Sequence, residues 1–115
     1  AIDINNDYTQ KAKANAERVG LTTIDFVTAD VKDFVIENNR YDVIILTGSI
    51  SEVPQKFIDG LTATGRLFAF VGQHGETVTS GTVFQNQLGE IRTNPVFEIE
   101  LERLHGFEDQ PKFVF

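Results

Sequence analysis

The sequence predicts an α/β domain whose sheet is mostly parallel and closes with an antiparallel hairpin. Two continuous apolar runs, at residues 43–46 and 67–71, are typical of strands covered on both faces. Helical segments separate the early strands, and the last third of the chain alternates polar and apolar residues around Gly89. We therefore expect one unit over residues 1–115.

The first third of the chain is expected to hold two strands and one helix. Asn6 and Asp7 are short polar residues that can cap the start of a helix, and Gly20 can end it because glycine accepts the left-handed conformation. The expected elements are strands at residues 1–5 and 23–28, a helix at residues 8–19, and a short helix or turn at residues 31–38.

The middle of the chain gives the clearest pattern. Pro54 is suited to the first position of a helix, where its missing amide costs nothing. Phe57, Ile58 and Leu61 form an apolar stripe on that helix, and Gly65 is expected to end the segment. This helix is expected to connect two strands, at residues 41–47 and 67–71.

The remaining residues predict a long hairpin and a short closing strand. Its two arms are expected at residues 76–88 and 91–101, on either side of Gly89. Phe113, Val114 and Phe115 are expected to form the terminal strand.

Composition excludes several classes of function. The formal charge of −7 disfavours binding to a nucleic-acid backbone. No apolar stretch approaches the roughly 20 residues that a membrane span needs. The absence of cysteine excludes disulfides and thiolate zinc sites, and the default compartment is the cytoplasm.

Polar residues at the ends of the predicted strands are the first candidates for a site, because ligands of parallel sheets bind beyond the carboxyl ends of strands. Asp3 and Asp30 each follow a strand. One carboxylate could accept hydrogen bonds from both hydroxyls of a ribose, and the other could accept one from the exocyclic amine of an adenine. The alternative is that these aspartates are turn or capping residues.

Two further strand ends offer weaker candidates. Thr47, Gly48 and Ser49 follow the most apolar strand, where Gly48 would admit a ligand and the hydroxyls would bind a polar substrate. A flexible, capped turn is the alternative interpretation. His74 follows Gly72 and is a weak substrate-binding candidate, and two isolated histidines do not predict a metal site.

Several segments resemble the protein-L-isoaspartate O-methyltransferase family. Tyr41-Asp42-Val43-Ile44-Ile45-Leu46-Thr47-Gly48-Ser49 is similar to its central strand and the turn that follows, and Gly65-Arg66-Leu67-Phe68-Ala69-Phe70-Val71-Gly72 to its next strand. Val53-Pro54 with Leu61 resembles the helix between them, and Pro111-Lys112-Phe113-Val114-Phe115 resembles the ending of bacterial members.

The resemblance implies the carboxy-terminal portion of a Rossmann-like class I methyltransferase that uses S-adenosyl-L-methionine. Asp3, with Ile4 beside it, would hold the cofactor ribose. Asp30 would face the adenine amine, with Ala29 and Val31 beside the ring, and Thr47 and Gly48 would also line the cofactor site. The methyl acceptor would be the carboxylate of an isoaspartyl residue in a damaged protein, the first step of its repair.

The chain also departs from the family pattern. Ala29-Asp30-Val31 stands where the family has Gly-Asp-Gly, and Thr64-Gly65 where it has a Gly-Gly pair. The glycine-rich loop and the strand that normally precede Asp3 are absent, so the chain alone is expected to be inactive. That strand would lie between the strand ending at Asp3 and the strand at residues 41–47. We therefore expect altered strand pairing, a homodimer through the exposed edges, or a longer parent chain.

Two other functions remain open from the residues themselves. An acidic strand end also holds the ribose of a dinucleotide in NAD(P)-dependent oxidoreductases. A non-catalytic domain that keeps the fold would also tolerate Ala29 and Val31 beside Asp30.

Overall fold

The computed structural model describes residues 1–110 and divides the chain into two compact units. The first unit covers Ala1–Val35 and the second begins at Ile36. The predicted terminal strand at residues 113–115 lies outside the described residues. The expectation of one domain over residues 1–115 stays a prediction.

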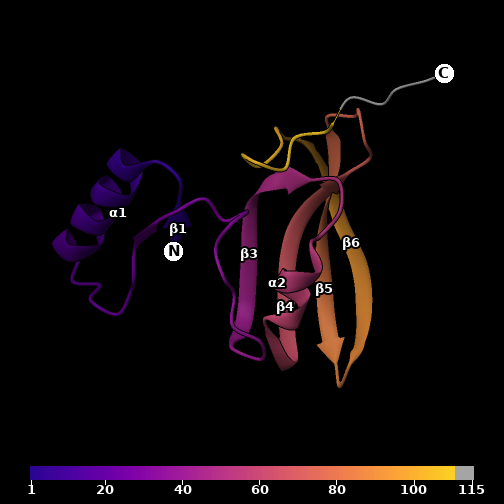
Figure 1. The fold of residues 1–115 in the computed structure, drawn as a ribbon, viewed down its shortest axis with the longest axis horizontal. Helices are drawn as coiled ribbons and strands as arrows, with labels where there is room; N and C mark the ends of the chain where they lie inside the picture. The colour runs from indigo at the N-terminus through magenta and orange to yellow at the C-terminus, as the bar shows by residue number, and fades with distance from the viewer. Residues whose placement is uncertain (111–115) are drawn as a thin grey trace. The chain divides into compact units, whose positions relative to one another are not determined.

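The first unit is a small β-α-β arrangement (Figure 1). Strand β1 (Ile2–Asp3) pairs in parallel with β2 (Val27–Thr28), and helix α1 (Asn6–Arg18) connects them. Asn5, one residue before the predicted cap, accepts hydrogen bonds from the amides of Asp7 and Tyr8 and so begins the helix. Gly20 follows the helix with φ +81°, as its predicted role as terminator requires.

One prediction for this unit needs correction, and another is narrowed. The second strand is short, because only Val27 and Thr28 pair with β1. Residues 31–33 form a turn, which is one of the two alternatives expected for residues 31–38. The amides of Asp33 and Phe34 both donate to the carbonyl of Asp30, at 3.1 Å each, and this local turn takes the place of a continuing helix.

The second unit contains a four-stranded sheet in the order β3-β4-β5-β6. The elements are β3 (Tyr41–Ile50), α2 (Gln55–Asp59), β4 (Leu61–Gly72), β5 (Val78–Gln87) and β6 (Glu90–Glu100). Strand β3 runs parallel to β4, whereas β4–β5 and β5–β6 are antiparallel. The predicted α/β class, with parallel pairs followed by an antiparallel hairpin, is confirmed.

The boundaries of β3, α2 and β4 differ from the prediction. Helix α2 ends at Asp59 with Gly60 as its cap, and Gly65 lies inside β4 rather than after the helix. A Cβ atom at Gly65 would lie 3.0 Å from the carbonyl oxygen of Tyr41, so glycine is needed where the two strands approach closely. Strand β3 continues to Ile50 through a shift in register between Ile45 and Ser49.

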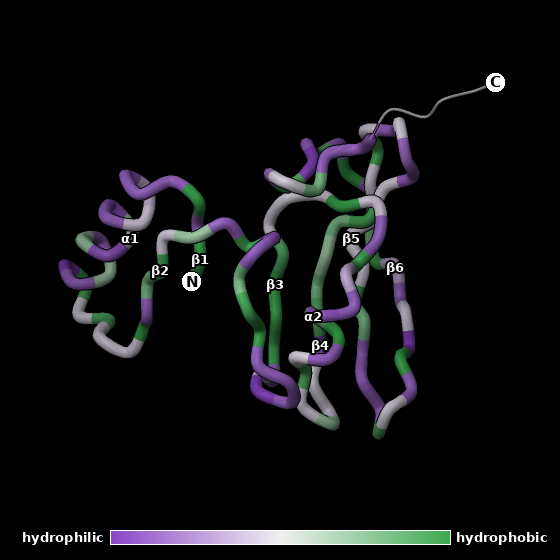
Figure 2. The backbone as a smooth tube through the Cα atoms, viewed as in Figure 1, coloured by the Kyte–Doolittle hydropathy of each residue, from purple (hydrophilic) through white to green (hydrophobic). Residues whose placement is uncertain are grey.

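One face of this sheet holds the core of the unit. Leu67 and Ala69 on β4 are fully buried, and Phe57 anchors α2, which contacts β4, at 1% exposure. Apolar residues continue along β3 and β4 (Figure 2). The buried apolar residues of the unit are Leu46, Ile50, Phe57, Leu61, Leu67 and Ala69.

The opposite face is open, so the prediction that residues 43–46 are covered on both sides is wrong for this structure. Val43 is 54% and Ile45 is 61% exposed. Helix α2 is the one helix described in the unit, and five residues cannot cover two faces. On this open face the ring of Phe97 lies above Gly81, where a Cβ atom would come within 2.7 Å of it.

Among the described residues neither β1 nor β3 has a second neighbouring strand, although Ser49 of β3 forms one isolated bridge to Arg103. Among the described residues β1 pairs only with β2, and β3 only with β4 of the named strands. Each therefore ends its sheet with backbone groups that face outward. Within residues 1–110 no helix is long and apolar enough to cross a membrane.

Candidate functional site

Asp3 and Asp30 lie at the same edge of the first unit. Asp3 is the last residue of β1 and is in register with Thr28, the last residue of β2. The amide of Ala29 donates to the carbonyl of Asp3 at 3.0 Å, and Asp30 follows directly. The predicted position of both carboxylates, at the carboxyl ends of adjacent parallel strands, is confirmed.

Both aspartates also hold the turns that follow their strands. Oδ1 of Asp3 accepts a hydrogen bond from the amide of Asn5 at 2.8 Å, and Oδ1 of Asp30 accepts one from the amide of Lys32 at 2.9 Å. A carboxylate offers about four lone-pair positions on its two oxygens, so one such bond does not exhaust it. The turn interpretation is therefore correct for both residues and does not exclude a ligand role.

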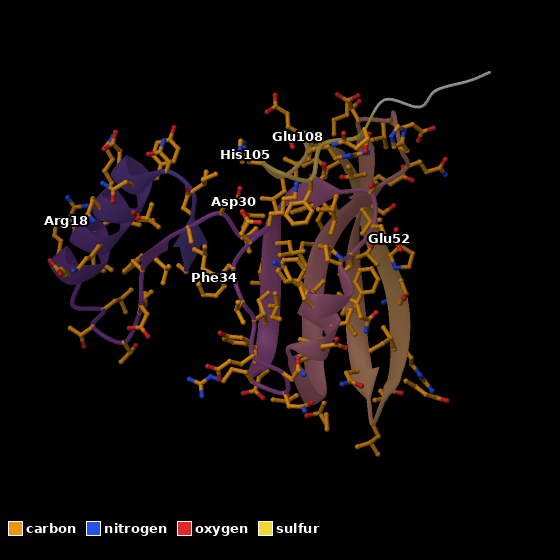
Figure 3. All side chains as sticks on the ribbon, viewed as in Figure 1. Arg18, Asp30, Phe34, Glu52, His105 and Glu108 are labelled. Atoms are coloured by element: carbon orange, nitrogen blue, oxygen red, sulfur yellow. The ribbon has the colours of Figure 1, made fainter. Side chains whose placement is uncertain are left out.

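The neighbours of these carboxylates are available to a ligand. Asp3 is exposed, Ile4 is 46% exposed, and Ala29, Asp30 and Val31 are half-buried. Figure 3 shows Asp30 on the loop that leaves β2. The roles of these residues beside an adenosyl group stay predictions.

The second unit uses Thr47, Gly48 and Ser49 differently from the prediction. They lie inside β3 and do not form a turn. A Cβ atom at Gly48 would lie 2.8 Å from the Cα of Leu104, so the close approach that glycine permits here is made by the chain itself. The role of Gly48 in admitting a ligand stays a prediction.

Ser49 is buried and joins β3 to the segment after β6. Its hydroxyl donates to the carbonyl of Leu101 at 2.9 Å and accepts from Arg103 Nη1 at 3.0 Å. Its backbone also bonds to Glu102 and Leu104. Ser49 has no exposed surface and supports this segment, and its predicted contact with substrate stays a prediction.

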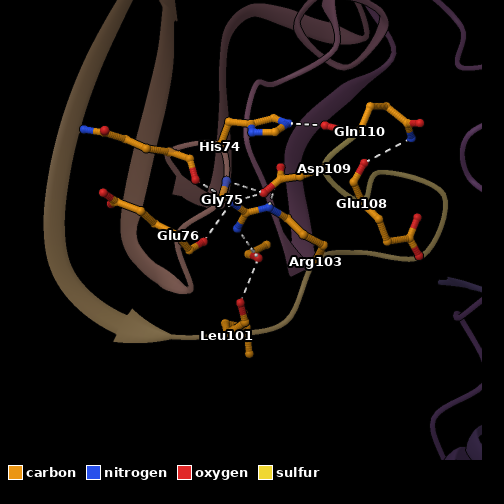
Figure 4. Close-up of polar contacts among 10 residues, drawn as sticks. His74, Gly75, Glu76, Leu101, Arg103, Glu108, Asp109 and Gln110 are labelled. Atoms are coloured by element: carbon orange, nitrogen blue, oxygen red, sulfur yellow. Dashed lines mark hydrogen bonds and ion pairs between the residues drawn. The ribbon is translucent and has the colours of Figure 1, made fainter. Parts of the chain in front are cut away.

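Arg103 is the centre of a polar network that the sequence did not predict (Figure 4). Its side chain is 10% exposed. Nη2 donates to the carbonyls of Gln73 at 2.7 Å and Glu76 at 3.0 Å, in the loop between β4 and β5. Nε and Nη2 donate to the two carboxylate oxygens of Asp109 at 3.1 and 3.2 Å.

This network changes the titration of Asp109. The hydrogen bonds from Arg103 and then from the Gly75 amide lower the pKa of the Asp109 carboxyl below its usual range. A lowered pKa in the folded state stabilises the fold only while the group is ionised. That contribution is present above about pH 4, the unfolded value, and is lost as the pH falls through the lowered pKa.

His74 is exposed and lies in the same loop. Its Nε2 is 2.6 Å from the carbonyl oxygen of Gln110, which ties the loop to the last described residues. Its weak substrate role stays a prediction. Within the described part of the chain no three histidine or acidic side chains come together as a group that could hold a metal ion.

Comparison with known proteins gives a consistent family. Residues 1–100 match the family model described as protein-L-isoaspartate(D-aspartate) O-methyltransferase (PCMT). A protein-L-isoaspartate O-methyltransferase of Methanoculleus marisnigri is 38% identical over 66 residues, which are 57% of this chain and 30% of that protein. One from Methanococcus maripaludis strain S2 is 28% identical over 98 residues, 85% of this chain and 46% of its own.

Solved structures agree on the fold. A protein-L-isoaspartate O-methyltransferase superposes with a TM-score of 0.78 at 24% identity, covering 94% of this chain and 34% of its own. A β-aspartate methyltransferase from Plasmodium falciparum in complex with S-adenosyl-L-homocysteine gives 0.74 at 20% identity, covering 90% and 50%. The chain thus spans less than half the length of the curated relatives described above.

Proposed function

Because the chain belongs to the protein-L-isoaspartate(D-aspartate) O-methyltransferase family, we propose that it serves S-adenosylmethionine-dependent methylation of isoaspartyl carboxylates in damaged proteins. The observation that carries this proposal is the position of Asp3 and Asp30 at the carboxyl ends of the parallel pair β1–β2. Acceptor-only carboxylates suit the hydroxyl and amine donors of an adenosyl group.

Each residue has a binding role in this proposal. Asp3 accepts hydrogen bonds from the ribose hydroxyls, and Ile4 lies beside the sugar. Asp30 accepts from the exocyclic amine of adenine, with Ala29 and Val31 against the ring. The cofactor role of Thr47 and Gly48, in the second unit, stays a prediction from the resemblance, and the close contact of Gly48 with Leu104 weighs against a direct ligand contact there.

The chemistry asks little of acid or base residues. The sulfonium of S-adenosylmethionine supplies an activated methyl group, and an ionised carboxylate is already a nucleophile. The contribution of the protein is then to hold the two groups in line and to exclude water. Because the chain spans less than half of its relatives, we propose that it holds the adenosyl group without catalysing transfer by itself.

Titration with S-adenosyl-L-homocysteine, followed by amide NMR, tests the adenosyl site. We expect shifts at residues 3–5 and 29–32, even for weak binding. Asp3→Asn and Asp30→Asn should each reduce affinity by about 10- to 100-fold, the effect of losing a hydrogen bond to a charged group.

Asp25→Asn is the matched control, because Asp25 is exposed and precedes the amino end of β2, away from the proposed site. This variant should bind like the unmodified chain. An absence of amide shifts in the unmodified chain at millimolar ligand would contradict the proposal and favour a non-catalytic domain. Shifts with NADH and none with the adenosyl ligand would favour the oxidoreductase alternative, which the family match does not support.

We also propose that β3 pairs with the same strand of a second copy, so that two sheets join into one. Strand β3 pairs with β4 among the named strands and exposes Val43 and Ile45, and the bridge of Ser49 to Arg103 occupies its other edge near the carboxyl end. Sedimentation equilibrium should detect a dimer that Ile45→Lys abolishes, because a charge on an edge strand opposes pairing. Leu88→Lys, at a residue 85% exposed in the hairpin turn, should leave the dimer intact, and a monomer at all concentrations would contradict the proposal.

The remaining expectations concern compartment and other partners. A cytoplasmic location and the absence of nucleic-acid and membrane partners stay predictions from composition.

A further inference from the structure

The carboxylate of Asp109 occupies a cradle of three hydrogen-bond donors (Figure 4). Arg103 Nε donates to Oδ1 at 3.1 Å and Nη2 donates to Oδ2 at 3.2 Å. The amide of Gly75 donates to Oδ2 at 2.7 Å. This bidentate guanidinium contact with an added amide is a typical arrangement for carboxylate recognition.

The cradle is held in place by contacts that do not involve Asp109. Arg103 bonds to the Ser49 hydroxyl and to the carbonyls of Gln73 and Glu76, all neutral acceptors. Ser49 is itself buried and fixed to Leu101. The guanidinium should therefore keep its position when a different carboxylate replaces that of Asp109.

The surroundings leave room for another ligand. Gly75 has φ +84°, and a Cβ atom there would meet nothing within 4 Å, so the space beside its Cα is open while its amide donates to Asp109. Two hydrogen bonds join residues 105–110 to the loop at residues 73–77: Asp109 to Gly75 and His74 to Gln110. The loop follows the carboxyl end of β4, the edge at which ligands of parallel strands bind.

We propose that Arg103 and the Gly75 amide form a carboxylate-binding site, that Asp109 fills it as an internal ligand, and that a carboxylate of a peptide can take its place. The identification of the ligand as a peptide rests on the proposed function, in which the substrate is an acidic residue of a protein chain. The recognition of a carboxylate rests on the geometry alone.

Exchange with acetate tests the site without any adenosyl ligand. In Asp109→Ala the cradle is empty, and acetate should raise the melting temperature by about 5 °C at a tenfold excess over its Kd, compared with chloride at equal ionic strength. The amide resonance of Gly75 should shift with the same Kd. The unmodified chain should respond much less, because Asp109 competes for the site.

Three outcomes would overturn the proposal. They are the absence of a Gly75 shift in Asp109→Ala, an equal response in Arg103→Lys/Asp109→Ala, and an acetate response in the unmodified chain as large as in the variant. If Asp109→Ala does not fold, Asp109→Asn leaves an acceptor for the Gly75 amide but no charge, and acetate should still bind. A short peptide with one free carboxylate then tests the substrate class, and its failure beside a positive acetate result would count against the proposed function and leave the carboxylate site standing.

Discussion

Replacing Phe57 with alanine is expected to lower the free energy of unfolding of the second unit by about 3–5 kcal/mol. Phe57 is 1% exposed, and it is the one buried apolar residue of α2. Its ring contacts that of Phe107 at a centroid distance of 6.4 Å. The substitution leaves a cavity between α2 and β4 where the ring was. The loss is large also because a helix of five residues has few other contacts that hold it in place.

Urea unfolding followed by circular dichroism measures this loss. Phe57→Leu retains much of the apolar volume and should lose less than Phe57→Ala. Leu88→Ala is the matched control, since Leu88 is 85% exposed and its truncation should change stability by no more than about 0.5 kcal/mol. A loss below about 1 kcal/mol for Phe57→Ala would contradict the packing of α2 against the sheet.

The elements that sequence predicted well are those fixed by local signals. The apolar run at residues 43–46 lies within β3, and Gly20 and Gly89 each have positive φ angles of 81° and 97° at the ends of elements. Asp3 and Asp30 could be placed at one edge because adjacent parallel strands bring their carboxyl ends together. Their common position follows from topology and needs no knowledge of side-chain contacts.

The features that sequence missed depend on partners far along the chain. The sequence suggests that Gly48 admits a ligand or lies in a flexible turn, whereas in the structure its lack of a side chain admits Leu104. Arg103 and Ser49 are 54 residues apart, and Gly75 and Asp109 are 34 apart. No spacing rule connects such residues, so nothing in the sequence around Arg103 predicted that it would be the centre of a polar network.

The open face of the sheet shows a different limit. A continuous apolar run predicted that β3 is covered on both faces, and its residues have the composition for it. The cover itself must come from another element, and α2 is too short to supply two layers. Sequence patterns thus predict which surfaces a strand can bury, and not whether a partner is present to bury them.

Arg103→Met is expected to lower the free energy of unfolding by about 1–3 kcal/mol, because it leaves three neutral acceptors without their donor. The part-buried Ser49 hydroxyl accounts for most of this loss, since water can replace the guanidinium at the exposed carbonyls of Gln73 and Glu76. Hydrogen exchange should also become faster at Gly75, whose amide donates to Asp109. Arg66→Met, at an exposed arginine on β4, should change stability by no more than about 0.5 kcal/mol.

A comparison with Asp109→Asn decides whether the Arg103 guanidinium keeps its position without the carboxylate of Asp109. Removing the charge of Asp109 leaves Arg103 bonded to its three neutral acceptors, so this variant should lose clearly less stability than Arg103→Met. At a pH below the lowered pKa of Asp109 the unmodified chain should approach the stability of Asp109→Asn, because its own carboxyl is then neutral. If Asp109→Asn instead lowers the free energy of unfolding as much as Arg103→Met at neutral pH, the position of the arginine depends on Asp109. The guanidinium would then not be held in position for another carboxylate.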